Sequence, residues 1–215
     1  MASTTSPRAQ KPIKGWQIAF GTLLASSSGA AILAHVFGPL PMSFTVPFVV
    51  MPTVFFLIAV IMLKNKLHQQ FHAAATALLV GAIGGFLGTI VYDISRPLLK
   101  VVLGFKLNPF AALPIFGSLM TGRPETDRIA IVAGWLYHIW NGISFGMMFG
   151  LVRRRGGPVL GALWGFVLQC LMFASYPKLL HVRMQDPGFI TMGLTGHALW
   201  GGVLGWYVQN KGSKS

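Results

Sequence analysis

Six apolar runs, each about as long as a helix needs to cross the hydrocarbon core of a bilayer, dominate this sequence. We therefore expect an all-α fold: an integral membrane bundle of six transmembrane helices. Because the runs fill most of the chain, little length remains for a separate soluble domain. The six runs cover residues 15–36, 44–63, 73–95, 129–152, 158–176 and 188–208.

The composition supports a membrane location. Hydrophobic residues make up 53% of the 215 residues and charged residues only 10%, whereas soluble domains carry roughly 25% charged residues. We expect residues 1–14 to form a disordered cytoplasmic tail, 15–209 the transmembrane domain, and 210–215 a polar cytoplasmic tail. As an alternative, the first run is a signal peptide cleaved near Gly29, although it is longer than the usual apolar core of one.

The basic residues argue against a nucleic-acid partner, despite a net charge of +13. Lys and Arg form short clusters at the ends of the apolar runs, where basic residues anchor and orient membrane helices. With the N-terminus on the inner side, the inner segments carry more Lys and Arg than the outer ones, and most of the outer basic residues lie in one long loop. This excess of basic residues on the inner side predicts that both termini are inside. The expected partners are the lipid bilayer and other membrane subunits.

The chain contains an apparent internal duplication. Run three aligns with run five at one constant offset, and run four aligns with run six at another because the loop between the runs is shorter in the second copy. Both copies cross the membrane in the same direction. Such copies should be related by a pseudo-two-fold axis along the membrane normal. The identical pairs include Gly81 and Gly161, Ala82 and Ala162, Gly85 and Gly165, Phe86 and Phe166, Ser95 and Ser175, and Pro97 and Pro177.

Glycines recur at every fourth position in both copies, so that they share one face of each helix. In lipid, small residues on one face let helix backbones approach closely and gain van der Waals contact. We expect these stripes to be the packing faces of the bundle. The stripe glycines are Gly81, Gly85, Gly134, Gly142, Gly146, Gly161, Gly165, Gly193, Gly201 and Gly205.

Polar residues lie on the same faces and therefore point toward other helices. His138 and His197 each stand between stripe glycines, and Asp93 continues the stripe of its own helix. The two histidines are equally far from the outer ends of their helices, roughly 15 Å deep at a rise of about 1.5 Å per residue. Buried ionisable groups mark functional sites in membranes. The supporting polar residues of this predicted cluster are Arg96, Thr89, Asn141, Gln169 and Tyr92.

The histidine pair allows more than one chemistry. His138 and His197 on pseudo-symmetric helices resemble the arrangement in which two histidines hold a haem, and neighbouring glycines would leave space for a flat macrocycle. A transition metal is the other cofactor expected, with Asp93 as a further ligand. Alternatively, each histidine donates a hydrogen bond across a helix interface or relays protons, and Asp93 pairs with Arg96 three residues on.

Residues 98–127 form an unusually long outer loop. Its middle, residues 109–120, is apolar but too short to span a bilayer. This segment is interpreted as an interfacial or re-entrant element, and alternatively as a lid over the polar cluster.

The run His138-Ile-Trp-Asn-Gly-Ile-Ser-Phe-Gly, followed by the glycine-rich run ending at Pro177 and by His197-Ala-Leu-Trp-Gly-Gly-Val-Leu-Gly, is similar to small bacterial inner-membrane families of unknown function. The resemblance covers about the second half of the chain, and its motifs consist mostly of glycine and apolar residues. It implies a helical bundle in the bacterial inner membrane and no particular activity.

Three classes of function remain open from the sequence. In the first, the histidine pair binds haem or a metal for membrane redox or lipid-soluble substrate chemistry. In the second, the cluster is a pathway for protons or a small solute. In the third, the chain is an accessory or assembly subunit of a membrane complex that docks through its glycine stripes. The sequence does not decide whether the protein is an enzyme.

Overall fold

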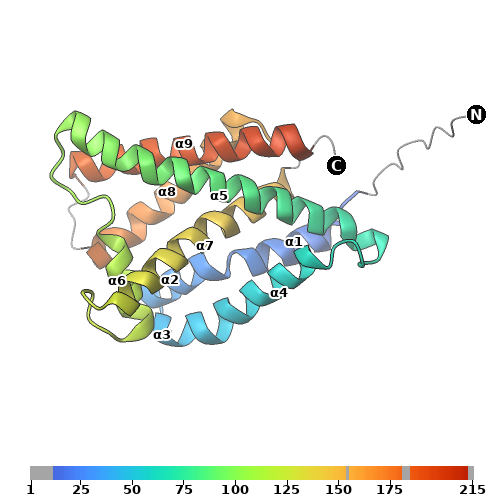
Figure 1. Cartoon of the computed structure of the whole chain (residues 1–215), viewed down its shortest axis with the longest axis horizontal. Coiled ribbons are helices and arrows are strands. Elements are labelled where there is room, and N and C mark those ends of the chain that lie inside the picture. The colour runs from blue at the N-terminus through green and yellow to red at the C-terminus, as the bar shows by residue number, and fades with distance from the viewer. Residues whose placement is uncertain (1–11, 154, 181–184, 213–215) are drawn as a thin grey trace, which may run out of the picture.

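A computed structural model describes residues 12–153, 155–180 and 185–212, and these residues form helices and no strands. The helices run roughly along the long axis of the molecule (Figure 1). In chain order they are α1 (Gly15–Ala25), α2 (Ser27–Phe37), α3 (Met42–Thr45), the π-helical turn η1 (Val46–Val50), α4 (Met51–Met62), α5 (Gln69–Leu103), α6 (Ala112–Thr121), α7 (Arg128–Val152), α8 (Pro158–Leu180) and α9 (Pro187–Gly212).

An all-helical bundle with candidate membrane-spanning helices agrees with the coarse fold class expected from the sequence. By length and composition, three helices of the described residues could cross a membrane: Met42–Met62, Gln69–Leu103 and Pro158–Pro177. The bent pair α1 and α2 makes a fourth candidate if it is one span. Helices α7 and α9 are also long, with 25 and 26 residues, but they are not among these candidates.

Helix α5 is longer than the apolar run at 73–95 that predicts it, because it continues through Pro97 to Leu103. Proline removes a single backbone donor and does not always end a helix. Arg96 follows the apolar run directly. Its guanidinium is paired inside the protein with Asp93 and with the Pro109 carbonyl. Helix α5 ends at Gly104, whose φ of 69° is in the left-handed region that favours glycine.

The first predicted span is broken at Ser26, where α1 and α2 meet at an angle of 55°. The Ser26 hydroxyl donates to the Leu23 carbonyl at 2.8 Å, and bonds of this kind bend helices. Two residues further on, the Tyr137 hydroxyl of α7 donates to the Ser28 carbonyl, and the Ser28 and Ser144 hydroxyls lie 3.1 Å apart. These contacts fasten the bent segment to α7.

Helices α5 and α7 approach each other through glycines. A Cβ atom added to Gly81 or Gly146 would lie less than 3.0 Å from the backbone of the other, and the same is true of Gly85 against Gly142. Real Cβ atoms essentially never come so close. The two backbones are therefore in direct contact, as small residues allow.

A second glycine contact joins α8 to α9. Gly161 meets Gly201 and Gly205, and Gly165 meets the backbone of His197, again with less than 3.0 Å for an added Cβ. The remaining two stripe glycines have other neighbours: Gly134 faces Leu113 of α6, and Gly193 faces the Gln169 side chain of α8.

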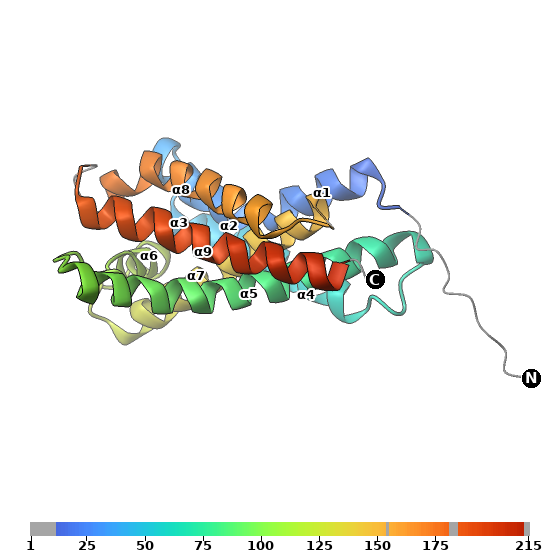
Figure 2. The same ribbon diagram turned by 90° about the horizontal axis from the view of Figure 1, so that it is seen from above.

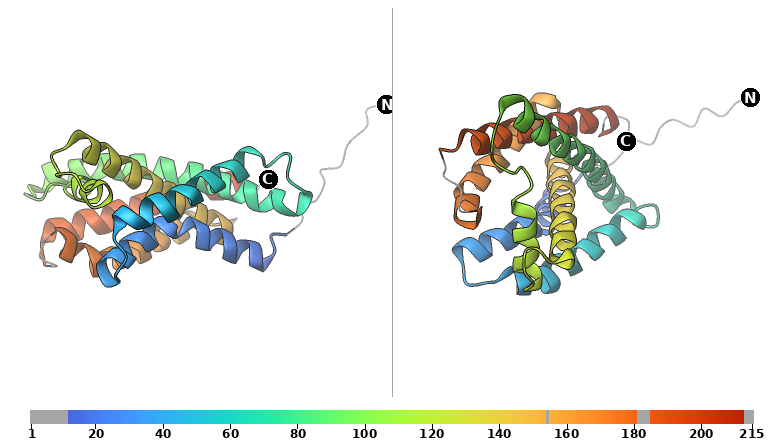
Figure 3. Two further views of the ribbon diagram at one scale, coloured as in Figure 1. Left: turned by 90° about the horizontal axis from the view of Figure 1, so that it is seen from below. Right: turned by 60° about the vertical axis from the view of Figure 1, so that its left-hand side comes forward.

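Helix α5 lies between α7 and α9, α8 packs on α9, and α6 packs on α7. Figure 2 shows α5 and α9 running side by side, and Figure 3 shows α1, α2 and α4 grouped beside α7. The start of α1 and the end of α9 lie at the same end of the molecule, while α6 lies toward the other (Figure 1).

Helix α7 begins directly after Asp127, whose carboxylate accepts a hydrogen bond from the Ile129 amide at 2.7 Å and pairs with Arg123 at 3.1 Å. Both partners favour the charged form and lower the pKa of the Asp127 carboxyl. An acidic residue at this position satisfies free amides at the start of the helix.

Neighbouring glycines provide a direct test of the backbone contacts. Gly201→Ala places a Cβ against the backbone of Gly161, whereas Gly202→Ala meets nothing within 4 Å. We expect Gly201→Ala to destabilise the protein by about 1–3 kcal/mol through overpacking. Gly202→Ala should stabilise it by about 0.5–1 kcal/mol, since alanine is the better helix former. Equilibrium unfolding in mixed micelles measures both, and equal effects of the two changes would contradict the contact.

Candidate functional site

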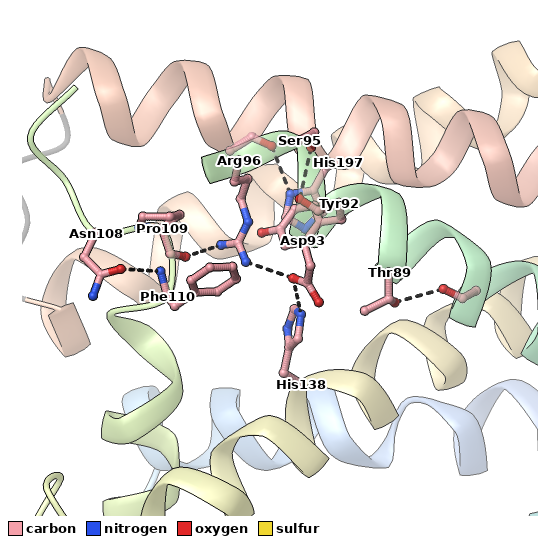
Figure 4. A network of polar contacts seen from close by, with 12 residues as sticks. Thr89, Tyr92, Asp93, Ser95, Arg96, Asn108, Pro109, Phe110, His138 and His197 are labelled. Carbon is pink, nitrogen blue, oxygen red and sulfur yellow. Dashed lines mark hydrogen bonds and ion pairs between the residues drawn. The ribbon is translucent and has the colours of Figure 1, made fainter. Parts of the chain in front are cut away.

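The centre of the candidate site is the carboxylate of Asp93 on α5. One of its oxygens, Oδ1, accepts hydrogen bonds from Arg96 Nη2 at 3.2 Å and from His138 Nε2 at 2.9 Å (Figure 4). All three side chains are mostly buried, with exposed fractions of 20%, 12% and 18% for Asp93, Arg96 and His138. The ion pair with Arg96 follows from the spacing of three residues, whereas the contact with His138 joins two helices.

Arg96 connects α5 to the segment that precedes α6. Its Nη1 atom donates to the Pro109 carbonyl, and its guanidinium carbon lies 4.0 Å from the ring centroid of Tyr92 and 5.1 Å from that of Phe110. Cation–π contacts of this kind stabilise a desolvated guanidinium. Figure 4 shows the side chain reaching from α5 to this segment between the two rings. The same cation therefore neutralises Asp93 and fixes the cover of the site.

His197 on α9 is held differently from His138. Its Nδ1 atom lies 3.0 Å from the Gly193 carbonyl of its own helix, and because a carbonyl only accepts, this nitrogen carries a proton. In the neutral ring Nε2 is then an acceptor. The ring of Tyr92 contacts both histidines, with centroid distances of 4.8 Å to His197 and 5.8 Å to His138.

A cavity of about 60 Å³ lies between these side chains. Both histidines line it, and α6 closes it on one side with Ala112, Leu113 and Phe116. Asp93 does not line the cavity but stands behind His138. A second cavity of about 60 Å³ shares Tyr92 and Arg96 with the first. We call the first one the polar cavity.

Two polar atoms in the wall of the polar cavity are buried without a protein partner: Arg96 Nε, a donor, and Asn141 Oδ1, an acceptor. Buried polar atoms in folded proteins nearly always have a partner, which can be water or a ligand. The residues that line the cavity therefore include one unpartnered donor and one unpartnered acceptor.

The structure brings together most residues of the cluster predicted from the sequence. Thr89, Tyr92, Arg96, Asn141 and both histidines line the polar cavity. The Thr89 hydroxyl donates to the Gly85 carbonyl of its own helix at 2.9 Å rather than to a histidine. Gln169 lies in the wall of the second cavity.

Sequence reasoning missed the Pro109 carbonyl and the rings of Phe110, Phe116 and Tyr176, which complete the surroundings of the site. Pro109, Phe110 and Phe116 lie in the apolar, aromatic middle of the loop at 98–127, and this composition was the signal that could have indicated them. That segment contains α6, which packs along α7 with Gly117 against Ala130. Helix α6 lines the polar cavity, which is the position that the alternative interpretation as a lid requires.

The geometry favours a small hydrogen-bonding group over haem. The ring of Tyr92 lies against both histidines, and ligand pockets usually have volumes of about 300–1,000 Å³, much more than the polar cavity provides. Among the described residues, no group of three or more His, Cys, Asp or Glu side chains is placed to hold a metal ion.

No protein-family model matches this chain, and no curated protein or solved structure matches it either. The chemistry of the site is therefore inferred from its own residues: a histidine oriented by a carboxylate, a clamped guanidinium, and one free donor and acceptor.

The shared carboxylate predicts a specific stability pattern. Asp93→Leu removes the negative partner of Arg96 and should destabilise the fold by about 3 kcal/mol, since an unpaired buried charge is costly. The double change Asp93→Leu with Arg96→Leu removes both charges and should recover part of this loss. A double-mutant cycle on unfolding free energies in micelles measures the coupling, and additive losses would contradict a buried ion pair.

Proposed function

We propose that this chain is a six-span bundle of the bacterial inner membrane, with both termini inside and its last four helices forming two copies of one hairpin. The supporting observation is that both hairpins pair through their glycine stripes. Gly81 meets Gly146 in the first pair, and its counterpart Gly161 meets Gly201 and Gly205 in the second. The second pair is thus shifted by up to one helical turn relative to the first.

Within this bundle, the proposed function is to bind a small hydrogen-bonding group in the polar cavity and to exchange a proton with it through His138. The observation that carries this proposal is the 2.9 Å contact between His138 Nε2 and Asp93 Oδ1 behind the cavity wall. A carboxylate that accepts from Nε2 orients the ring and fixes its tautomer. The other nitrogen, Nδ1, is then available to take or give a proton.

The roles of the other residues follow from their contacts. Arg96 and Asn141 contribute the unpartnered donor and acceptor that position the bound group. His197 donates from Nδ1 to its own backbone, so it serves as a neutral acceptor in the wall. Helix α6, held by Arg96 through the Pro109 carbonyl, excludes water from the site.

The alternative of an accessory subunit docked through the glycine stripes receives less support. The stripe glycines already contact neighbouring helices of this chain. A partner subunit would therefore have to bind another face of the bundle.

Histidine NMR tests the proposal. In protein labelled with ¹⁵N-histidine and held in lipid nanodiscs, the His138 side-chain signal is identified by its loss in His138→Gln. Adding hexanoate, a small carboxylate, should move this signal in a saturable way, and Asp93→Asn should reduce the change at least tenfold. His72, outside the polar cavity, serves as the control through His72→Gln. A His138 signal that ignores hexanoate at every concentration would refute proton exchange with such a group.

A further inference from the structure

An apolar groove of about 260 Å³ lies where α1 and α2 bend, between α2, α7 and α8. Gly29, Ala30 and Leu33 form its α2 side, and Trp164 and Leu171 form its α8 side. Ala30, Leu33 and Leu171 are exposed at its rim, so the groove opens on the outer surface of the bundle. In the proposed arrangement this surface faces lipid.

The groove adjoins the polar cavity. Both are lined by Asn141, Phe145, Leu168, Met172 and Tyr176. The junction contains the unpartnered Oδ1 atom of Asn141. The groove and the polar cavity are therefore neighbours that share one wall.

The groove also continues in the opposite direction. A second apolar hollow of about 220 Å³ shares Met148 and Trp164 with it and extends along α7 to Val152. The Trp164 indole donates to the Phe145 carbonyl at 3.2 Å and so fixes α8 against α7 along this path. From Asn141 to Val152 the path is roughly 16 Å long at a helical rise of about 1.5 Å per residue. One extended hydrocarbon chain has this shape.

We propose that the groove and the polar cavity together bind a long-chain fatty acid that enters sideways from the bilayer. The carboxyl head lies in the polar cavity, and the hydrocarbon chain lies in the groove along α7. This inference rests on the proposed function, because it names the substrate class of the same site.

The chemistry of a carboxyl group matches the cavity. Its oxygens accept from Arg96 Nε, and its protonated form donates to Asn141 Oδ1, so it uses both unpartnered atoms. When this single proton passes from the carboxyl group to His138 Nδ1, the O–H bond breaks and an N–H bond forms, and the remaining carboxylate keeps its hydrogen bond from Arg96 Nε. A cavity of about 60 Å³ admits a carboxyl head and excludes the larger head group of a phospholipid.

Photo-crosslinking tests the position of the chain. The probe is palmitate carrying a diazirine near its methyl end, added to the full-length protein in nanodiscs and mapped by mass spectrometry. Labelling should concentrate on α8 near Trp164 and on the neighbouring stretch of α7, and excess palmitate should reduce it at least fivefold. Exposed Phe55 and Phe56 on α4, which do not line the groove, report labelling from the bilayer.

Two matched tryptophan variants sharpen the test. Ala30→Trp fills the groove and should lower the competed labelling at least fivefold. Leu23→Trp adds the same ring on α1, at an exposed position that lines neither apolar hollow, and should leave labelling unchanged. If Ala30→Trp does not fold, the competition by palmitate on the unmodified protein decides alone.

The outcomes separate the two proposals. Labelling of α4 equal to that of the groove, or labelling that palmitate does not compete, overturns the fatty-acid site and indicates surrounding lipid only. If hexanoate still moves the His138 signal in that case, the proton-exchange function survives without the groove. If hexanoate has no effect while palmitate labels the groove specifically, the groove binds a chain but the proposed head-group chemistry is wrong.

Discussion

The site depends on the direct backbone contact between α5 and α7. Gly85 and Gly142 meet where any Cβ would clash, and this brings the two helix axes close together. His138 lies one turn from Gly142, and Asp93 lies two turns from Gly85, in each case toward the end of the bundle where α6 lies. At this short separation the imidazole and the carboxylate come within 2.9 Å. A larger residue at either glycine would move the ring away from its carboxylate.

The buried charges in turn hold the cover of the cavity. Arg96 pairs with the Asp93 carboxylate and, through Pro109 and Phe110, also fixes the chain that leads into α6. The ion pair therefore links the glycine contact to the position of α6. Loss of Asp93 should disturb the cover as well as the histidine.

Local spacing predicted which residues share the site, and tertiary contacts decided how they meet. Steps of four placed Asp93, His138 and His197 on packing faces, and a step of three predicted the Arg96 pair. The insertion of Tyr92 against both histidines could not be predicted, since ring positions depend on the distances between three helices. The bend at Ser26 was missed because the apolar run at 15–36 continues unbroken through it.

In the proposed duplication, the polar cavity lies where the two copies meet. Tyr92 and Arg96 correspond to Met172 and Tyr176 at the same constant offset, and all four line the cavity. At these positions the first copy thus contributes a charged side chain, and the second contributes an apolar and an aromatic one. The counterpart of Asp93 is Phe173, which packs on Phe189 at 5.5 Å.

Only His138 therefore has a carboxylate behind it, while His197 is bonded to its own backbone. The asymmetric pair polarises the cavity. His138 is the proton-exchanging group in the proposed function, and its helix α7 also lines the apolar groove, whereas none of the residues that line the groove comes from α9, which carries His197. That polarity suits an amphipathic molecule, whose reactive head and inert chain need different surroundings within one bundle.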